Sequence, residues 1–137
     1  MAVIIKEDKK AAQGALEILL STLPRSEKGI HSIAYSIGLI CREAGIPVEQ
    51  ATVVVMSWGE RLRAFPNFRE LFPLYKKPAF FRYQIRYAVQ SAYKRSQDTP
   101  SSLRFKTLTG KTPPAASFWD KLPESKTRNR NIKTPAD

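Results

Sequence analysis

Apolar side chains recur every three or four residues along most of the first 94 residues, which is the spacing of amphipathic α-helices. The pattern predicts four main helices, over residues 8–22, 30–44, 47–62 and 78–94. The β-branched run 53–55 is typical of strands, but it lies inside a helical repeat with no turn before Trp58. The sequence therefore predicts an all-α protein.

Glycine and proline mark where these helices begin and end. Gly45 is suited to the left-handed stop of the second helix, and Pro47 and Pro78 are suited to the first turns of the next two. Residues 64–79 contain three prolines, so no long helix can run through them, yet they are too apolar for a free linker. We expect a packed, irregular connection there with room for one short helical turn.

The composition changes near the C-terminus. A short apolar piece over 103–108 is closed by Gly110, and from residue 112 prolines alternate with Lys, Arg, Asn and Thr. Such a mixture cannot bury enough surface to order itself. We predict a compact four- to five-helix bundle over 1–111, followed by an extended or disordered basic tail over 112–137.

Positive charge is concentrated in the second half of the chain. The formal net charge is +11, yet residues 1–60 hold 6 basic and 7 acidic side chains. Residues 61–95 hold 9 basic side chains and a single acidic one, Glu70. Such a concentration indicates a polyanionic partner, most simply nucleic acid, although a charged surface that only aids solubility is the alternative.

Several classes of function are disfavoured by what the sequence lacks. One cysteine and one histidine allow neither an intrachain disulfide nor a Cys/His zinc site. No apolar run reaches the ~20 residues of a membrane span, so we expect no membrane partner and a cytoplasmic location. There is no glycine-rich phosphate loop, paired carboxylate cluster or spaced nucleophile and base. We expect no metal, no cofactor and no enzymatic activity.

The helix over 78–94 has a second face outside its apolar stripe. That face carries Arg82, Tyr83, Arg86, Tyr87, Gln90, Tyr93 and Lys94. Basic groups neutralise phosphates, and tyrosine rings offer flat faces on which unpaired bases stack. The face therefore favours single-stranded nucleic acid. The alternatives are that Tyr83 and Tyr87 widen the core stripe and that the arginines are simply solvated.

Other basic residues flank the neighbouring helix ends. Arg61, Arg63 and Arg69 lie at or after the end of the third helix, and Lys76 and Lys77 directly precede the fourth. We predict that these two ends converge on one basic patch that contributes to nucleic-acid binding.

The start of the second helix is a further candidate phosphate site. Lys28 and His31 lie there beside Gly29, where free backbone N–H groups and the positive end of the helix attract anions. The alternative is that His31 is a capping or packing residue.

Five pieces follow one another in a set order over residues 25–110: Glu27-Lys28-Gly29-Ile30-His31, residues 40–47, Trp58-Gly59-Glu60-Arg61, residues 85–94 and residues 100–110. This order resembles the primase C-terminal domain, a helical domain of plasmid, phage and mobile-element primases and primase-helicases. The most telling piece, Val89-Gln90-Ser91-Ala92-Tyr93, is similar to the family's V-x-S-A-Y signature. The resemblance implies a non-catalytic bundle that holds template DNA, with an initiating nucleotide as an open possibility, beside an active site supplied elsewhere.

We therefore interpret the chain as a single-stranded-DNA-binding domain of a primase or replication protein, with a catalytic primase or helicase as partner. One alternative is a helix-turn-helix regulator of duplex DNA, with residues 45–47 as its turn. The other is a protein-interaction module that docks through Phe65, Phe68, Phe72 and Trp119.

Overall fold

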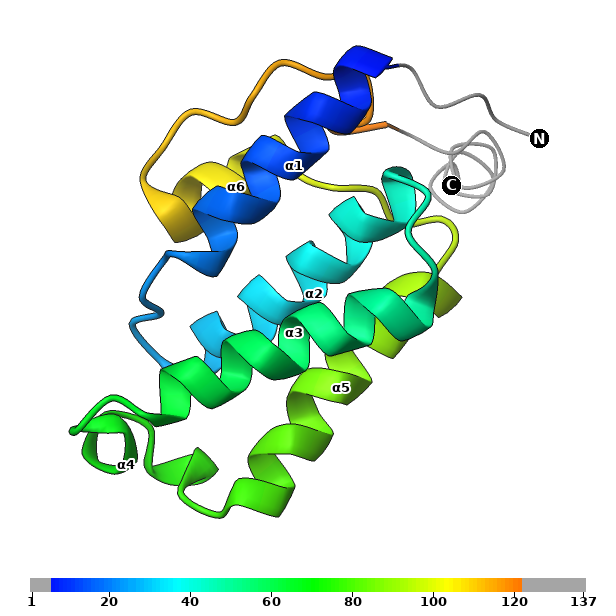
Figure 1. Cartoon of the computed structure of the whole chain (residues 1–137). Coiled ribbons are helices and arrows are strands. Elements are labelled where there is room, and N and C mark those ends of the chain that lie inside the picture. The colour runs from blue at the N-terminus through cyan, green and yellow to red at the C-terminus, as the bar shows by residue number, and fades with distance from the viewer. Residues whose placement is uncertain (1–5, 122–137) are drawn as a thin grey trace, which may run out of the picture.

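One helix, α2, runs through the middle of the molecule, and the other helices pack around it (Figure 1). The computed structural model describes residues 6–121. Its helices are α1 (Lys6–Leu20), α2 (Glu27–Glu43), α3 (Val48–Arg63), α4 (Phe68–Leu71), the 3₁₀ turn η1 (Pro73–Tyr75), α5 (Pro78–Lys94) and α6 (Ser102–Thr109). No strand occurs within this range, and the predicted all-α bundle is confirmed.

The core lies on both sides of α2. Figure 1 shows α1 and α6 on one side of this helix and α3 and α5 on the other, and α2 contacts all four. Every residue from Ile33 to Cys41 is buried. The periodicity predicted a single apolar stripe, but Tyr35, Ser36 and Leu39 are buried as well, because α1 and α6 cover the second face.

Gly38 of α2 lies against α5 with no room for a side chain. A β-carbon at this position would lie 2.8 Å from the β-carbon of Ala92 and 3.2 Å from the α-carbon of Val89, both on α5. The absence of a side chain at Gly38 therefore sets how closely α2 and α5 pack. This contact fixes the position of α5, the helix that carries the candidate nucleic-acid surface.

Most predicted helix ends lie within one residue of the observed ones, although α1 begins and ends two residues earlier than predicted. Gly45 and Gly110 both have left-handed backbone conformations, with φ of 79° and 72°, and they follow the last residue of α2 by two positions and that of α6 by one. The start of α2 was placed too late, because the helix begins at Glu27. The hydroxyl of Ser26 accepts a hydrogen bond from the Gly29 N–H at 3.0 Å and so caps the first turn.

The connection between α3 and α5 is packed, as predicted. It forms α4 and η1 and buries Phe68, Phe72 and Tyr75 against the bundle. The Phe68 and Phe81 rings meet edge to face with centroids 5.2 Å apart. Phe81 belongs to the first turns of α5, so this contact packs the connection against the N-terminal half of that helix.

The packed unit extends past residue 111, where a tail was predicted to begin. Phe118 is only 3% exposed, and Trp119 packs edge to face on Phe105 with centroids 5.3 Å apart. The Asp8 carboxylate accepts a hydrogen bond from the Ser117 N–H at 3.1 Å. The aromatic pair gives this proline-rich stretch enough apolar surface to pack. Residues 122–137 of the predicted tail lie outside the described range.

Candidate nucleic-acid interface

Two tyrosines form the most exposed aromatic surface of α5. Tyr83 and Tyr87 are 51% and 48% exposed, and their rings lie 21° from parallel with centroids 6.1 Å apart. They are four residues apart and therefore neighbours on the same helix face. The alternative that these rings widen the core stripe is wrong. Together they form an exposed pair of nearly parallel rings, and we call them the tyrosine pair.

Two positive side chains accompany the tyrosine pair. Arg86 lies three residues after Tyr83 and is exposed, and Lys94 is exposed at the C-terminal end of the helix. Neither forms an ion pair with a residue in the 6–121 range. Both cations are therefore available to an anionic ligand that contacts the rings.

Arg82 requires a correction, because it is already paired. Its Nε donates a hydrogen bond to the Glu60 carboxylate of α3 at 2.7 Å. The same hydrogen bond lowers the pKa of Glu60, with a smaller Coulombic contribution from Arg63. Arg82 and Glu60 are 22 residues apart on different helices. The predicted role of Arg82 as a free phosphate-binding cation is therefore not supported.

Tyr93 also differs from the predicted outward face. Its hydroxyl donates to the carbonyl oxygen of Ile46 at 2.5 Å, and burial raises its pKa. Tyr93 thus ties the end of α5 to the turn between α2 and α3. It is a structural residue and takes no part in the exposed aromatic surface.

The two helix ends of the predicted basic patch lie at the same end of the bundle, with α4 beside them (Figure 1). Lys76 and Lys77 are exposed there. Arg61 is exposed as well and lines a shallow cavity with Thr22 and Leu23 of the segment after α1. That these cations form one patch stays a prediction.

Arg63, the other cation at the end of α3, is half-buried. Its Nε has no hydrogen-bond partner among residues 6–121. Its positive charge also lowers the pKa of Glu60, but the ion pair of that carboxylate is with Arg82. Arg63 is therefore less accessible to a phosphate than its place in the sequence indicates.

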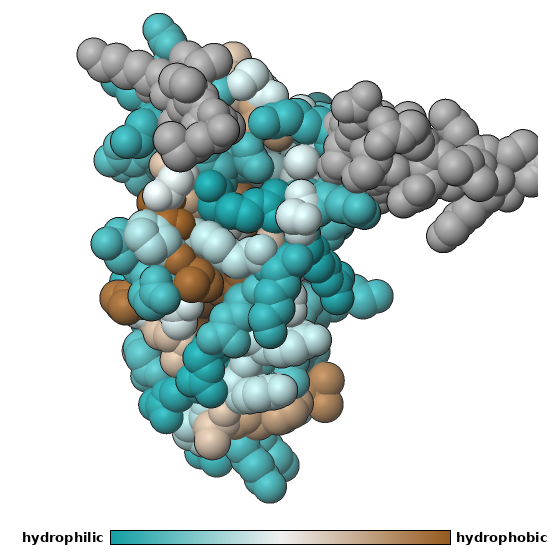
Figure 2. Space-filling model, turned by 90° about the vertical axis from the view of Figure 1, so that its right-hand side faces the viewer, coloured by the Kyte–Doolittle hydropathy of each residue, from teal (hydrophilic) through white to brown (hydrophobic). Residues whose placement is uncertain are grey.

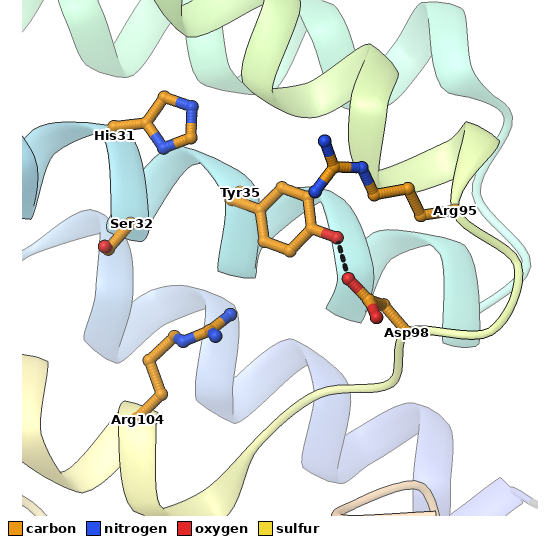
Figure 3. A pocket seen from close by; sticks show the side chains of 6 residues that line it. All are labelled: His31, Ser32, Tyr35, Arg95, Asp98 and Arg104. Atoms are coloured by element: carbon orange, nitrogen blue, oxygen red, sulfur yellow. Dashed lines mark hydrogen bonds between the residues drawn. The ribbon is translucent and has the colours of Figure 1, made fainter. Parts of the chain in front are cut away.

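His31 lies in a pocket that local sequence did not indicate. The pocket has a volume of about 230 Å³ and is lined by His31, Ser32, Tyr35, Arg95, Asp98 and Arg104 (Figure 3). Lys28, which was paired with His31 in the prediction, is exposed and does not line it. The Gly29 N–H at the start of α2 is occupied by Ser26. The candidate anion site is thus the pocket beside α2, rather than the first turn of the helix.

Two aromatic rings and two guanidinium groups line this pocket. The imidazole of His31 is almost parallel to the Tyr35 ring, at 9° with centroids 6.5 Å apart. The guanidinium carbons of Arg95 and Arg104 lie 6.0 and 5.8 Å from the centroid of the Tyr35 ring. Figure 3 shows these two groups approaching the ring from different elements, the end of α5 and α6.

Burial and positive neighbours change the protonation of the pocket. Burial lowers the pKa of His31, and Arg95 and Arg104 lower it further. Burial, with a hydrogen bond to the Asp98 carboxylate, raises the pKa of Tyr35 to about 12. At neutral pH the pocket therefore holds a neutral imidazole, a protonated phenol, two guanidinium groups and one carboxylate.

Arg42 holds the loop that forms one side of the pocket. Its Nη1 donates to the carbonyl oxygens of Ala92 at 2.7 Å and Arg95 at 3.0 Å, and its Nη2 donates to that of Asp98. A positive group at the last carbonyls of α5 also compensates the negative end of the helix dipole. The backbone that carries Arg95 and Asp98 is therefore fixed from α2.

Arg42→Met should lower the free energy of unfolding by about 2 kcal/mol, because three backbone carbonyls lose a charged donor. Urea denaturation followed by circular dichroism measures the change. Arg25→Met removes the same charge from an exposed position between α1 and α2 and should have little effect. Equal losses from the two variants would show that Arg42 contributes only its charge.

The surfaces proposed for protein docking are mostly inaccessible. Phe68 and Phe72 are 2% and 4% exposed, and the Trp119 indole donates to the carbonyl of Pro114 at 2.7 Å. Only Phe65 of the four predicted aromatic residues is substantially exposed. Figure 2 shows a largely hydrophilic face on which hydrophobic residues stand in small groups. These observations weaken the interpretation of the chain as a protein-interaction module that uses these aromatics.

No protein-family model, curated protein or solved structure matches this chain. Within residues 6–121 there is no group of three His, Cys, Asp or Glu side chains that could hold a metal ion. In the same range, no helix combines the length and the hydropathy needed to cross a bilayer.

Proposed function

We propose that this chain is a non-catalytic helical domain that binds single-stranded DNA as part of, or accessory to, a primase or another replication protein. The observation that carries the proposal is the exposed tyrosine pair with Arg86 and Lys94 beside it. Unpaired bases stack on such rings, and the cations neutralise phosphates. The partner, a catalytic primase or helicase, follows from the resemblance of residues 25–110 to the primase C-terminal domain.

The exposed residues of α5 suit an extended nucleic-acid strand better than a ligand that makes a single contact. Tyr83, Tyr87 and Lys94 follow one side of α5, and the distance from the first to the last is about 16 Å along the helix axis. The concentration of positive charge in residues 61–95 also attracts a polyanion to this part of the chain.

A duplex-binding helix-turn-helix is less well supported. In that interpretation α3 would be the recognition helix, inserted into the major groove. The exposed positions of α3 before Arg61 are Glu49, Gln50, Val53, Ser57 and Glu60. Two carboxylates and no cation on that surface oppose close approach to phosphates.

The test compares single-stranded and duplex DNA of the same sequence and length, titrated over a range of salt concentrations. The single strand should bind more tightly. Arg86→Gln should reduce the salt slope by about 0.7, the value expected for one lost phosphate contact on a single strand. The double variant Arg82→Gln with Arg86→Gln should reduce the salt slope by the same amount as Arg86→Gln alone, because Arg82 is paired with Glu60.

Arg25→Gln is the matched control for Arg86→Gln, because it removes the same charge from an exposed position between α1 and α2, outside the predicted surface. It should leave the salt slope unchanged. Preference for the duplex would support the helix-turn-helix alternative. An unchanged slope for Arg86→Gln would remove this arginine from the interface.

A further inference from the structure

The pocket beside α2 brings together groups from three separate parts of the chain. His31, Ser32 and Tyr35 come from α2, Arg95 and Asp98 from the end of α5 and the loop after it, and Arg104 from α6 (Figure 3). No side chain of the tyrosine pair lines it. The pocket is therefore a second site, distinct from the aromatic surface of α5.

We propose that this pocket binds a phosphate group. Two guanidinium groups supply planar sets of N–H donors that match phosphate oxygens, and the Ser32 hydroxyl supplies another donor. Tyr35 contributes its ring face, because its hydroxyl is used in the hydrogen bond to Asp98.

Asp98 sets the charge that the ligand must have. With Arg95 and Arg104 positive, Asp98 negative and His31 neutral, the empty pocket has a net charge of about +1. A dianionic phosphate would leave an excess of negative charge unless His31 gained a proton. The bound state is then electrically balanced, because imidazolium adds one positive charge and a further N–H donor.

The groups around His31 make its protonation more favourable when an anion is present. Within residues 6–121 the titratable groups that line the pocket with it are Tyr35, Arg95, Asp98 and Arg104. Burial and the two arginines keep the imidazole neutral in the empty pocket. An anion between the guanidinium groups removes the electrostatic part of that effect, so the pKa of His31 rises on binding.

Hydrogen bonds order the backbone around the pocket in the absence of a ligand. Arg42 fixes the loop that carries Asp98. The start of α6 is held by Asp120, which accepts a hydrogen bond from the Ser102 N–H at 3.0 Å, and by the Ser101 hydroxyl, which caps the Arg104 N–H. A binding site whose backbone is already ordered has a smaller entropic cost of binding.

The source of the phosphate is a strand phosphate or a free phosphate. A neighbouring shallow cavity, lined in part by Lys94, Arg95 and Asp98, shares the last two residues with the pocket. A strand lying along Tyr87 and Lys94 can therefore continue to the pocket. This strand source rests on the proposed function, whereas phosphate binding itself does not.

His31 is the only histidine in the chain, so its imidazole gives one unambiguous reporter. The experiment follows the imidazole by nuclear magnetic resonance over pH, in inorganic phosphate and in chloride at equal ionic strength. Phosphate should raise the pKa of His31. Arg95→Gln and Arg104→Gln should each weaken phosphate binding by about tenfold or more, since each removes a charged donor. Identical titrations in phosphate and chloride would overturn the proposal.

Lys106→Gln is the matched control, because it removes a charge from an exposed position of α6 that does not line the pocket. It should retain the response to phosphate, and a loss equal to that of Arg104→Gln would refute a specific site.

A single-stranded oligonucleotide then distinguishes the two sources of the phosphate. A shift of His31 by the oligonucleotide identifies strand phosphate, and a shift by inorganic phosphate alone identifies free phosphate. If the oligonucleotide fails to bind at all while inorganic phosphate still shifts His31, the proposed function fails and the pocket stands.

Discussion

Tyr83→Ala combined with Tyr87→Ala should weaken binding of single-stranded DNA by about a hundredfold or more. Each stacked base contributes about 1 to 3 kcal/mol, and the two exposed rings offer two such contacts. The rings are outside the core, so the double variant should keep its free energy of unfolding within about 1 kcal/mol of the parent. Fluorescence anisotropy with a labelled oligonucleotide at fixed salt measures the affinity.

The matched control keeps the rings and removes only the hydroxyls. Tyr83→Phe with Tyr87→Phe should bind close to the parent affinity, because stacking uses the ring face. If the alanine and phenylalanine variants lose affinity equally, the hydroxyls and not the ring faces make the contact. If the alanine variant binds within about threefold of the parent, the tyrosine pair is not the binding surface.

The order and extent of the helices were predictable because their signals are local. Gly45 and Gly110 stand where the backbone becomes left-handed, and Pro78 is the first residue of α5. The packing of residues 112–121 was missed for the opposite reason. Phe118 and Trp119 are two residues in a polar stretch. They are ordered by contacts with other parts of the fold, among them the Phe105 ring and, 109 residues before Ser117, the Asp8 carboxylate of α1.

The candidate sites show the same difference between local signals and long-range contacts. Tyr83 and Tyr87 share one helix face, so spacing alone predicts that they lie together, and they do. Spacing says nothing about Glu60, which pairs with Arg82 from another helix. The phosphate pocket joins residues that are more than 60 positions apart, and neither Arg95 nor Arg104 has a local pattern that distinguishes it from other surface arginines.

The position of α5, on which the tyrosine pair depends, relies on the absence of a side chain at Gly38. Gly38→Val should reduce the free energy of unfolding by about 3 kcal/mol or more, at the upper end of the cost of overpacking a core. The new β-carbon would meet the Ala92 β-carbon at 2.8 Å and the Val89 carbonyl oxygen at 3.3 Å. Neither atom can move by a side-chain rotation, so α2 and α5 must separate.

Gly14→Ala is the control within a helix, because a β-carbon there meets only Pro114 at an ordinary 3.7 Å. It should be neutral or stabilise by up to about 1 kcal/mol, as alanine is the better helix former. Thermal and urea unfolding measure both variants. A Gly38→Val protein as stable as the parent would show that the α2–α5 contact is loose. In that case the close packing of α5 could not be what orients the tyrosine pair.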